Sequence, residues 1–165
     1  MFNMYLNEKL FVDLVERGLN IEEVCQDFYK ETIWIEEIFR YPTAKELSEE
    51  NEDEVADFRL TPTTKILKNT KVFVKDRNWT PKNDELHHYY QTVSSGMLVN
   101  YLQEKLSDYE FTINFKNYGH NMLYAEISFA TETKVYERPQ NQLASCLLID
   151  QLYDFVKWLL DEKII

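Results

Sequence analysis

Apolar residues recur at helical spacing near the start of the chain. Within residues 10–15 they form an i, i+1, i+4, i+5 stripe, which is typical of an amphipathic helix. Gly18 follows this stripe, and glycine commonly occupies the position just past a helix C-terminus. Asn20, three residues before Glu23, forms a capping-box pattern at the start of a second apolar stripe. The first forty residues are therefore expected to be helical throughout, beginning with two helices separated by a short turn, and the second of these contains Val24 and Phe28.

A third helix is predicted over residues 33–39. Ile35 and Ile38 would share one side of it, and Pro42 disfavours helical backbone at the residue before it. These three helices predict an N-terminal helical unit over residues 1–42. The following residues, 43–64, lack apolar periodicity and are interpreted as an acidic connector.

The second half of the chain predicts an α+β domain over residues 65–165, because helical periodicity flanks strict alternation of apolar and polar residues. Two helices would pack on one small antiparallel sheet, in the order helix, β-hairpin, helix. The expected elements are a short strand over 70–75, a loop over 78–84, a helix over 89–106, strands over 109–116 and 122–130, a short third strand over 134–136 and a long helix over 141–163.

Charge is distributed unevenly along the chain. The net charge is −11, and residues 1–60 hold 16 Asp and Glu against 6 Lys and Arg, whereas residues 61–165 hold 13 against 12. Phosphate backbones repel such a chain, so general binding to DNA or to an anionic membrane is disfavoured. No run of 18 uncharged apolar residues is present, and the N-terminus lacks the pattern of a secretion signal. We therefore expect a cytoplasmic protein, within a host cell, that contacts a basic surface.

Part of the chain resembles a known family. A segment HHYYQTVSSGMLVNYL is followed by two aromatic-rich strands, YEFTINF and LYAEISF, and by the helix entry PQNQLASCLLI. Together, over about Asn78 to Trp158, these features resemble the small bacteriophage "ABA sandwich" domains. The resemblance implies a phage or prophage origin and a layering of helix, sheet and helix. It implies no activity, because it offers no catalytic residues to carry over.

Carboxylates are the candidate partner-binding residues. They can imitate the phosphates of a nucleic acid and occupy the basic groove of a DNA-handling enzyme, or they can form a solvated linker. The basic stretch from Lys65 to Lys82 could hold single-stranded nucleic acid, or it could neutralise the acidic stretch within the chain. The candidate residues are Glu36, Glu37, Glu46, Glu49, Glu50, Glu52, Asp53, Glu54 and Asp57.

A helix-turn-helix is the alternative interpretation of the N-terminal unit. Its turn would be Gly18-Leu19-Asn20 or Phe28-Tyr29-Lys30, but the second choice gives a reading helix richer in carboxylates than in lysines. A metal site near His87 and His88 is disfavoured, because adjacent histidines on a helix point about 100° apart.

The sequence favours binding over catalysis. With only three glycines, no loop can wrap phosphates closely, and no hydrolase, zinc-protease or P-loop motif is present. We expect no enzymatic activity, no cofactor and no metal. The expected function is inhibition of a host nucleic-acid-handling machine of the restriction or CRISPR type by a phage-encoded protein. The alternative is a DNA-binding regulator of phage or prophage genes. The apolar last helix leaves a homodimer open.

Overall fold

The computed structural model describes residues 4–26, 32–40, 62–68, 78–80, 85–116, 124–138 and 147–165. They combine helices with small antiparallel sheets, as expected for an α+β protein. The chain forms two compact units: unit 1 contains Met1–Glu31 and Thr92–Ile165, and unit 2 contains Thr32–Gln91. Both ends of the sequence therefore contribute to unit 1.

Unit 1 begins with α1 (Glu8–Glu16) and α2 (Ile21–Gln26). The side chain of Asn7 caps α1 by accepting a hydrogen bond from the backbone N–H of Leu10 at 2.9 Å. Gly18 has a φ of 108°, in the left-handed region that glycine adopts without steric cost. Asn20 accepts a hydrogen bond from the N–H of Glu23 at 3.3 Å. Within the described residues the two predicted helices and the turn between them are confirmed, whereas Phe28, which was expected in the second helix, lies outside those residues.

The remainder of unit 1 consists of α5 (Ser95–Lys105), β5 (Phe111–Lys116), β6 (Tyr124–Phe129) and α6 (Leu148–Asp161). β5 and β6 form an antiparallel pair in which Phe111 lies opposite Phe129. The short strand expected over 134–136 is reduced to a single bridge between Ala130 and Val135. The predicted hairpin strands are thus present at their expected positions.

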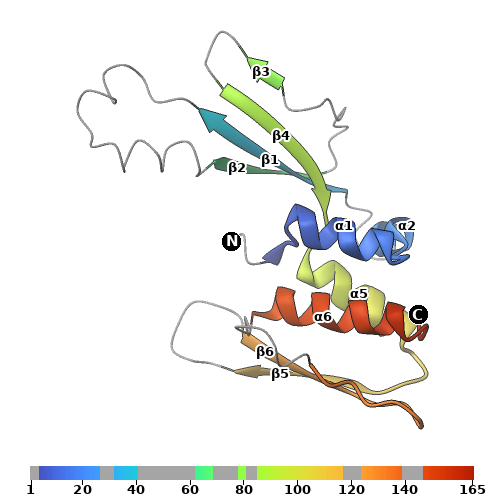
Figure 1. The fold of residues 1–165 in the computed structure, drawn as a ribbon. Coiled ribbons are helices and arrows are strands. Elements are labelled where there is room, and N and C mark those ends of the chain that lie inside the picture. Colours follow the sequence, from blue (N-terminus) through green and yellow to red (C-terminus); the bar gives the residue numbers. More distant parts are fainter. Residues whose placement is uncertain are drawn as a thin grey trace. The chain divides into compact units, whose positions relative to one another are not determined.

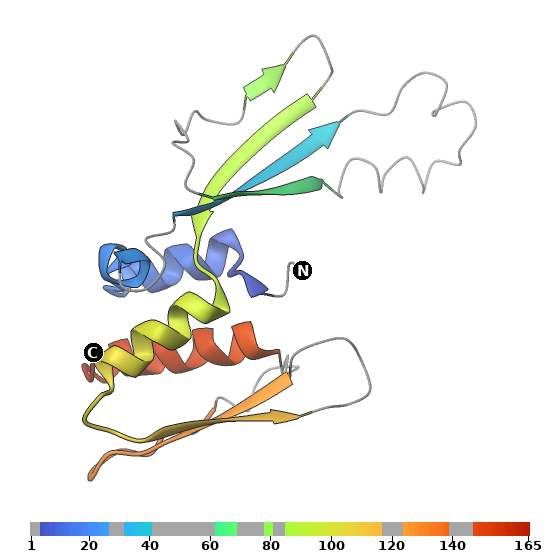
Figure 2. The same cartoon turned by 180° about the vertical axis from the view of Figure 1, so that it is seen from behind.

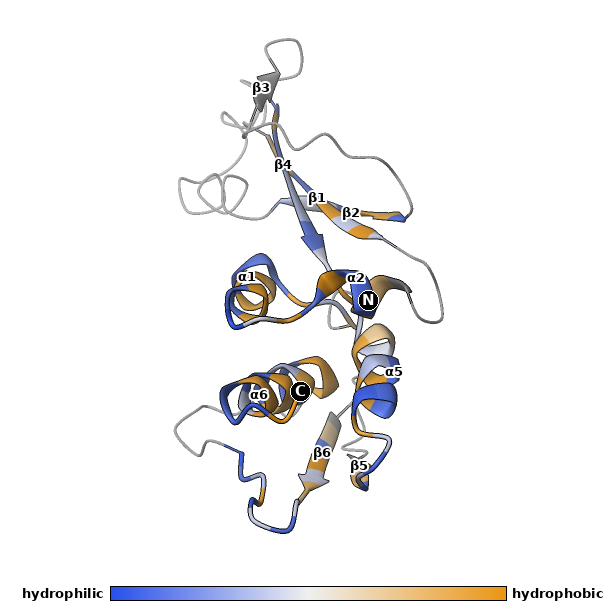
Figure 3. Cartoon of the chain, turned by 90° about the vertical axis from the view of Figure 1, so that its right-hand side faces the viewer, coloured by the Kyte–Doolittle hydropathy of each residue, from blue (hydrophilic) through white to orange (hydrophobic). Residues whose placement is uncertain are grey.

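Helices and hairpin form layers within unit 1. α6 contacts β6, α5 and α1, and α2 contacts α5. Figures 1 and 2 show α5 and α6 side by side, with the hairpin against one side of them and α1 against the other. Hydrophobic and hydrophilic residues occupy different sides of α1 and α6 (Figure 3). The fully buried side chains include Leu14, Leu98, Leu102, Leu152, Phe155 and Leu159.

Unit 2 is a four-stranded sheet with the strand order β2-β1-β4-β3. The strands are β1 (Ile33–Arg40), β2 (Thr63–Lys68), β3 (Asn78–Thr80) and β4 (Glu85–Thr92). β1 pairs antiparallel with β2, and β3 pairs antiparallel with β4. The arrowheads of β1 and β4 point in opposite directions in Figure 1, so neighbouring strands alternate in direction.

Two helix predictions are wrong, in whole or in part. Residues 33–39 form β1, and residues 89–92 belong to β4 rather than to the start of a helix. Ile33 and Ile35 are both buried, which is the period of two expected for one face of a strand. Ser94 marks the true start of α5, because its side chain accepts a hydrogen bond from the N–H of Met97.

The predicted domain boundaries also differ from the two units. α1 and α2 belong to unit 1 with the C-terminal residues, whereas the third predicted helix is a strand of unit 2. β2 begins inside the predicted connector, and β3 lies inside the predicted loop. The strand expected over 70–75 lies outside the described residues. Contacts between residues distant in sequence, such as those between α1 and α6, decide this division.

The hydrophobic core of unit 1 depends on Phe155. Its ring lies 4.9 Å from that of Tyr136, 5.4 Å from that of Phe129 and 6.0 Å from that of Phe111, measured between centroids. We expect Phe155→Ala to lower the free energy of unfolding by about 3–5 kcal/mol, because it removes buried surface and leaves a cavity. Urea unfolding measures this change. Phe115→Ala is the matched control, since Phe115 is 61% exposed; equal losses in both variants would contradict this description of the core.

Candidate functional site

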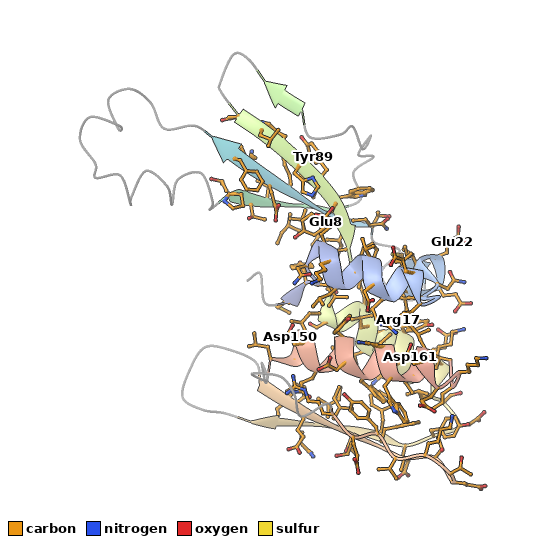
Figure 4. All side chains as sticks on the ribbon, in the orientation of Figure 1. Glu8, Arg17, Glu22, Tyr89, Asp150 and Asp161 are labelled. Atoms are coloured by element: carbon orange, nitrogen blue, oxygen red, sulfur yellow. The ribbon has the colours of Figure 1, made fainter. Side chains whose placement is uncertain are left out.

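Polar side chains from two neighbouring strands meet on one face of the sheet in unit 2. Glu85, His87 and Tyr89 alternate along β4, so their side chains leave the strand on the same face. Glu36 of β1 joins them: its Oε1 lies 2.7 Å from Nδ1 of His87 and accepts a hydrogen bond from the Tyr89 hydroxyl at 2.8 Å. Oε2 of Glu85 lies 3.0 Å from Nε2 of His87. Figure 4 labels Tyr89 within this group, which we call the histidine cluster.

Strand pairing explains why Glu36 reaches this face. β1 lies between β2 and β4. Glu36 is opposite Lys65 in the register of β1 with β2, and residues directly opposite each other in an antiparallel pair share a face. Glu36 is only 9% exposed, so its charge needs partners. His87, Tyr89 and the positive charge of Lys65 supply them.

The pKa values of the cluster follow from these contacts. Burial opposes the charged form of Glu36, but hydrogen bonds from His87 and Tyr89 outweigh it and lower the pKa of Glu36. The hydrogen bond with Glu36 raises the pKa of His87, and Glu85 adds to this effect against the opposing effect of burial. Burial and the bond to Glu36 raise the pKa of Tyr89. These contacts therefore favour the protonated form of His87, which lies between Glu36 and Glu85, and the neutral form of Tyr89.

This arrangement is better suited to holding strands together than to general-base catalysis. Both ring nitrogens of His87 face carboxylate oxygens, so each donates an N–H when the ring is protonated. A general base needs an unprotonated nitrogen within reach of its substrate. We infer that the histidine cluster cross-links β1 to β4.

The structure separates Glu36 from Glu37. The prediction placed both in a helix as partner-binding carboxylates, but adjacent residues of a strand point to opposite faces. Glu36 is buried within the histidine cluster, so its prediction as an exposed partner-binding carboxylate is wrong. Glu37 is intermediate in exposure and lies opposite Thr64. The other candidates lie outside the described residues: Glu46, Glu49, Glu50, Glu52, Asp53, Glu54 and Asp57.

Sequence reasoning missed the histidine cluster because it assigned His87 and His88 to the approach to a helix. In β4 the two histidines lie on opposite faces, and the ring of His88 lies near that of Tyr90, tilted by 34° at 5.9 Å between the centroids. The signal was present in the segment ELHHYYQT, whose aromatic and β-branched residues favour a strand. Within the described ranges, no three His, Cys, Asp or Glu side chains are grouped so that they could hold a metal ion.

Unit 1 carries a second feature, an excess of exposed carboxylates. Several of its cations are already bonded to acidic side chains: Arg17 to Asp13 and Asp161, Lys105 to Glu23, Lys134 to Glu162 and Arg138 to Asp154. Other carboxylates are exposed and make no ion pair with any residue in the described part of the chain. Glu110 is one of these residues, and five others are called the acidic surface: Glu16, Glu22, Asp108, Glu132 and Glu137. In Figure 4, Arg17 and Asp161 lie together, whereas Glu22 points outward.

The structure does not support the helix-turn-helix interpretation, because neither choice of turn is followed by a suitable reading helix in the described residues. With a turn at residues 28–30, that helix would occupy the segment that forms β1. With the turn at residues 18–20, the reading helix would be α2, which has six residues and two carboxylates in its first turn. The described residues of α2, Ile21–Gln26, include no Lys or Arg that could contact phosphate groups.

Comparison with known proteins gives no relative for this chain. No protein-family model matches it, and neither does any curated protein or solved structure. The resemblance to the phage ABA-sandwich domains therefore gains no support and stays a prediction. None of the helices in the described residues is long and apolar enough to cross a membrane.

Removing the charge of Glu36 tests the histidine cluster directly. We expect Glu36→Gln to lower the pKa of His87 toward its ordinary value, because the first cause of its raised pKa is lost. NMR titration of the imidazole signals measures this. The matched control is Glu37→Gln, which removes an adjacent charge from the opposite face and should leave the pKa of His87 almost unchanged. Equal shifts in both variants would contradict the assignment.

The raised pKa of His87 also predicts how stability changes with pH. A histidine whose pKa is higher in the folded state contributes stability that is complete below its unfolded pKa, near 6.5, and is lost as pH rises through the folded value. We expect the urea midpoint of the wild type to fall as pH rises above about 6.5. His87→Gln should have a lower midpoint at about pH 6, but a smaller fall above it. A fall of the same size in both proteins would exclude His87 as its cause.

Proposed function

We propose that this protein is a non-enzymatic binding protein that uses negative charge to attach to a protein with a basic surface. The partner class is a nucleic-acid-handling enzyme of the restriction or CRISPR type. The protein would inhibit it in the cytoplasm of a host cell, as a phage-encoded product. Its contacts would be the acidic surface of unit 1 together with the acidic run from Glu46 to Asp57.

The observation that carries this proposal is the charge left over in unit 1. Described cations such as Arg17 and Lys105 are held by internal carboxylates. They are therefore not available to neutralise exposed groups such as Glu16 and Glu22 without breaking existing ion pairs. The chain as a whole has a net charge of −11, so a surplus of negative potential remains.

Charge of this kind suits an enzyme that binds nucleic acid. Such enzymes line their grooves with Lys and Arg, which contact phosphate oxygens without reading sequence. Carboxylates on a folded surface can compete for the same cations. Complementary potentials also speed the encounter of two proteins, and salt weakens the attraction. The alternative of a DNA-binding regulator is favoured by no observation in the described residues.

DNA cleavage by purified restriction and CRISPR effector nucleases tests the proposal. We expect the protein to inhibit at least one such enzyme, with inhibition relieved by excess DNA and by added salt. Replacing the acidic surface by Gln and Asn should raise the concentration for half inhibition by roughly tenfold or more, which corresponds to about 1.4 kcal/mol of binding free energy. A second variant neutralises Glu49, Glu50, Glu52 and Asp53, and the same direction is expected.

The control variant removes positive charge instead. Lys9 and Lys163 are exposed residues of unit 1, and changing both to Gln makes the protein more acidic without touching any carboxylate. This variant should inhibit at least as well as the wild type. The proposal fails if no nuclease of these classes is inhibited, or if neutralising the carboxylates has no more effect than removing the two lysines.

A further inference from the structure

The outer edge of β5 is the feature that the preceding proposal does not use. The sheet that contains β5 has two strands, so among the described residues β5 pairs only with β6. On the other side of β6, the bridge between Ala130 and Val135 continues the pairing at one end. An unpaired strand edge presents backbone N–H and C=O groups to any second strand that can approach it.

The hydrogen bonds of β6 show which residues of β5 face outward. The N–H of Tyr136 donates to the carbonyl of Phe129 at 2.9 Å, so the backbone groups of Phe129 point away from β5. Phe111 lies opposite Phe129, and such a pair is of the non-hydrogen-bonded kind. The N–H and C=O groups of Phe111 therefore point to the outer edge. Because this direction alternates along a strand, those of Ile113 and Phe115 do so as well.

The sequence of β5 is complementary to itself in antiparallel orientation. If Ile113 is placed opposite Ile113 of a second copy, Phe111 lies opposite Phe115 and Thr112 lies opposite Asn114. The same register places Glu110 opposite Lys116 at both ends. Aromatic pairs and opposite charges are the cross-strand pairs that stabilise antiparallel sheets, each by roughly 0.2–1 kcal/mol. With the two-fold axis at Ile113, each residue from Glu110 to Lys116 therefore lies opposite a residue of compatible chemistry in the second copy.

The exposure of Phe115 fits the same arrangement. Phe111, Ile113 and Phe115 share one face of the strand, and on that face the ring of Phe111 packs near Phe155 of α6. Phe115 is nevertheless 61% exposed. In the two-fold register it would lie beside Phe111 of the second copy, so the apolar face would continue from one hairpin into the other. An exposed phenylalanine at the end of an apolar face is thereby covered.

We propose that β5 is a self-association edge, at which two copies of this chain join their hairpins into one four-stranded antiparallel sheet. A stable protein–protein interface buries roughly 1,200–2,000 Å². A single pair of strands with its flanking side chains buries less than this. The dimer is therefore in concentration-dependent exchange with the monomer. This inference is independent of the proposed inhibitor function, since it uses none of the acidic surface.

Sedimentation velocity of the full chain over a range of roughly 10 µM to 1 mM tests the proposal, because weak protein pairs associate in this range. We expect the weight-average sedimentation coefficient to rise with concentration. Phe115→Ser should shift the midpoint of this rise to higher concentration by about tenfold. Val135→Ser is the matched control: Val135 is 65% exposed but lies away from the β5 edge, so self-association should be unchanged.

A charge swap tests the register itself. Glu110→Lys places lysine opposite lysine across the two-fold axis, and Lys116→Glu places glutamate opposite glutamate, so each variant alone should weaken the dimer. The double variant restores opposite charges and should recover most of the wild-type association. If the protein stays monomeric over the whole concentration range, the proposal is wrong, and a strand of another protein becomes the expected partner of this edge. If the variants at Phe115, Glu110 and Lys116 all associate as strongly as the wild type, the proposed edge and register are wrong.

Discussion

The packing of α6 on its neighbours is the constraint on which unit 1 depends. α6 contacts the hairpin through β6, and it also contacts α5 and α1. A helix with several neighbours needs a wide apolar face, and this face is formed by Leu148, Ile149, Leu152, Phe155, Val156 and Leu159. Because α1 comes from the start of the chain and α6 from its end, this packing builds unit 1 from two stretches of sequence, and the segment that forms unit 2 lies between them in the sequence. The domain boundary is thus a consequence of one long-range contact surface.

Elements with local signals could be predicted from the sequence, and elements decided by tertiary contacts could not. Gly18, Asn20 and the alternation of residues 111–116 each carry a physical reason that needs no distant partner. The segment IWIEEIF fits both a helical and an alternating pattern, because its apolar residues recur at spacings of two and three. Its neighbours β2 and β4 select the strand, and these are separated from it by long stretches of sequence. Short apolar runs of this kind are ambiguous until their burial is known.

The same error concealed the histidine cluster. A helical assignment gives Glu36 and Glu37 neighbouring positions on one surface, whereas a strand sends them to opposite faces. It also separates His87 from Tyr89, which a strand returns to the same face. Glu36 could therefore be recognised as a buried, bonded group only after β1 and β4 were known to be neighbours. Composition reveals how many carboxylates a chain has, and pairing decides which of them remain available to a partner.

Charge consequently has two separate roles in this molecule. In unit 2 the carboxylate of Glu36 is partly desolvated, and its cost is offset by a protonated histidine and a tyrosine hydroxyl, which ties strands together. In unit 1 ion pairs such as that of Arg17 with Asp161 are about one-third to one-half exposed and contribute little stability each. Such a pair adds almost no net charge to the surface, so the potential around it is set by carboxylates that have no cation beside them. A surface can therefore stay negative although cations lie within it, and this is the physical basis for attraction to a basic partner.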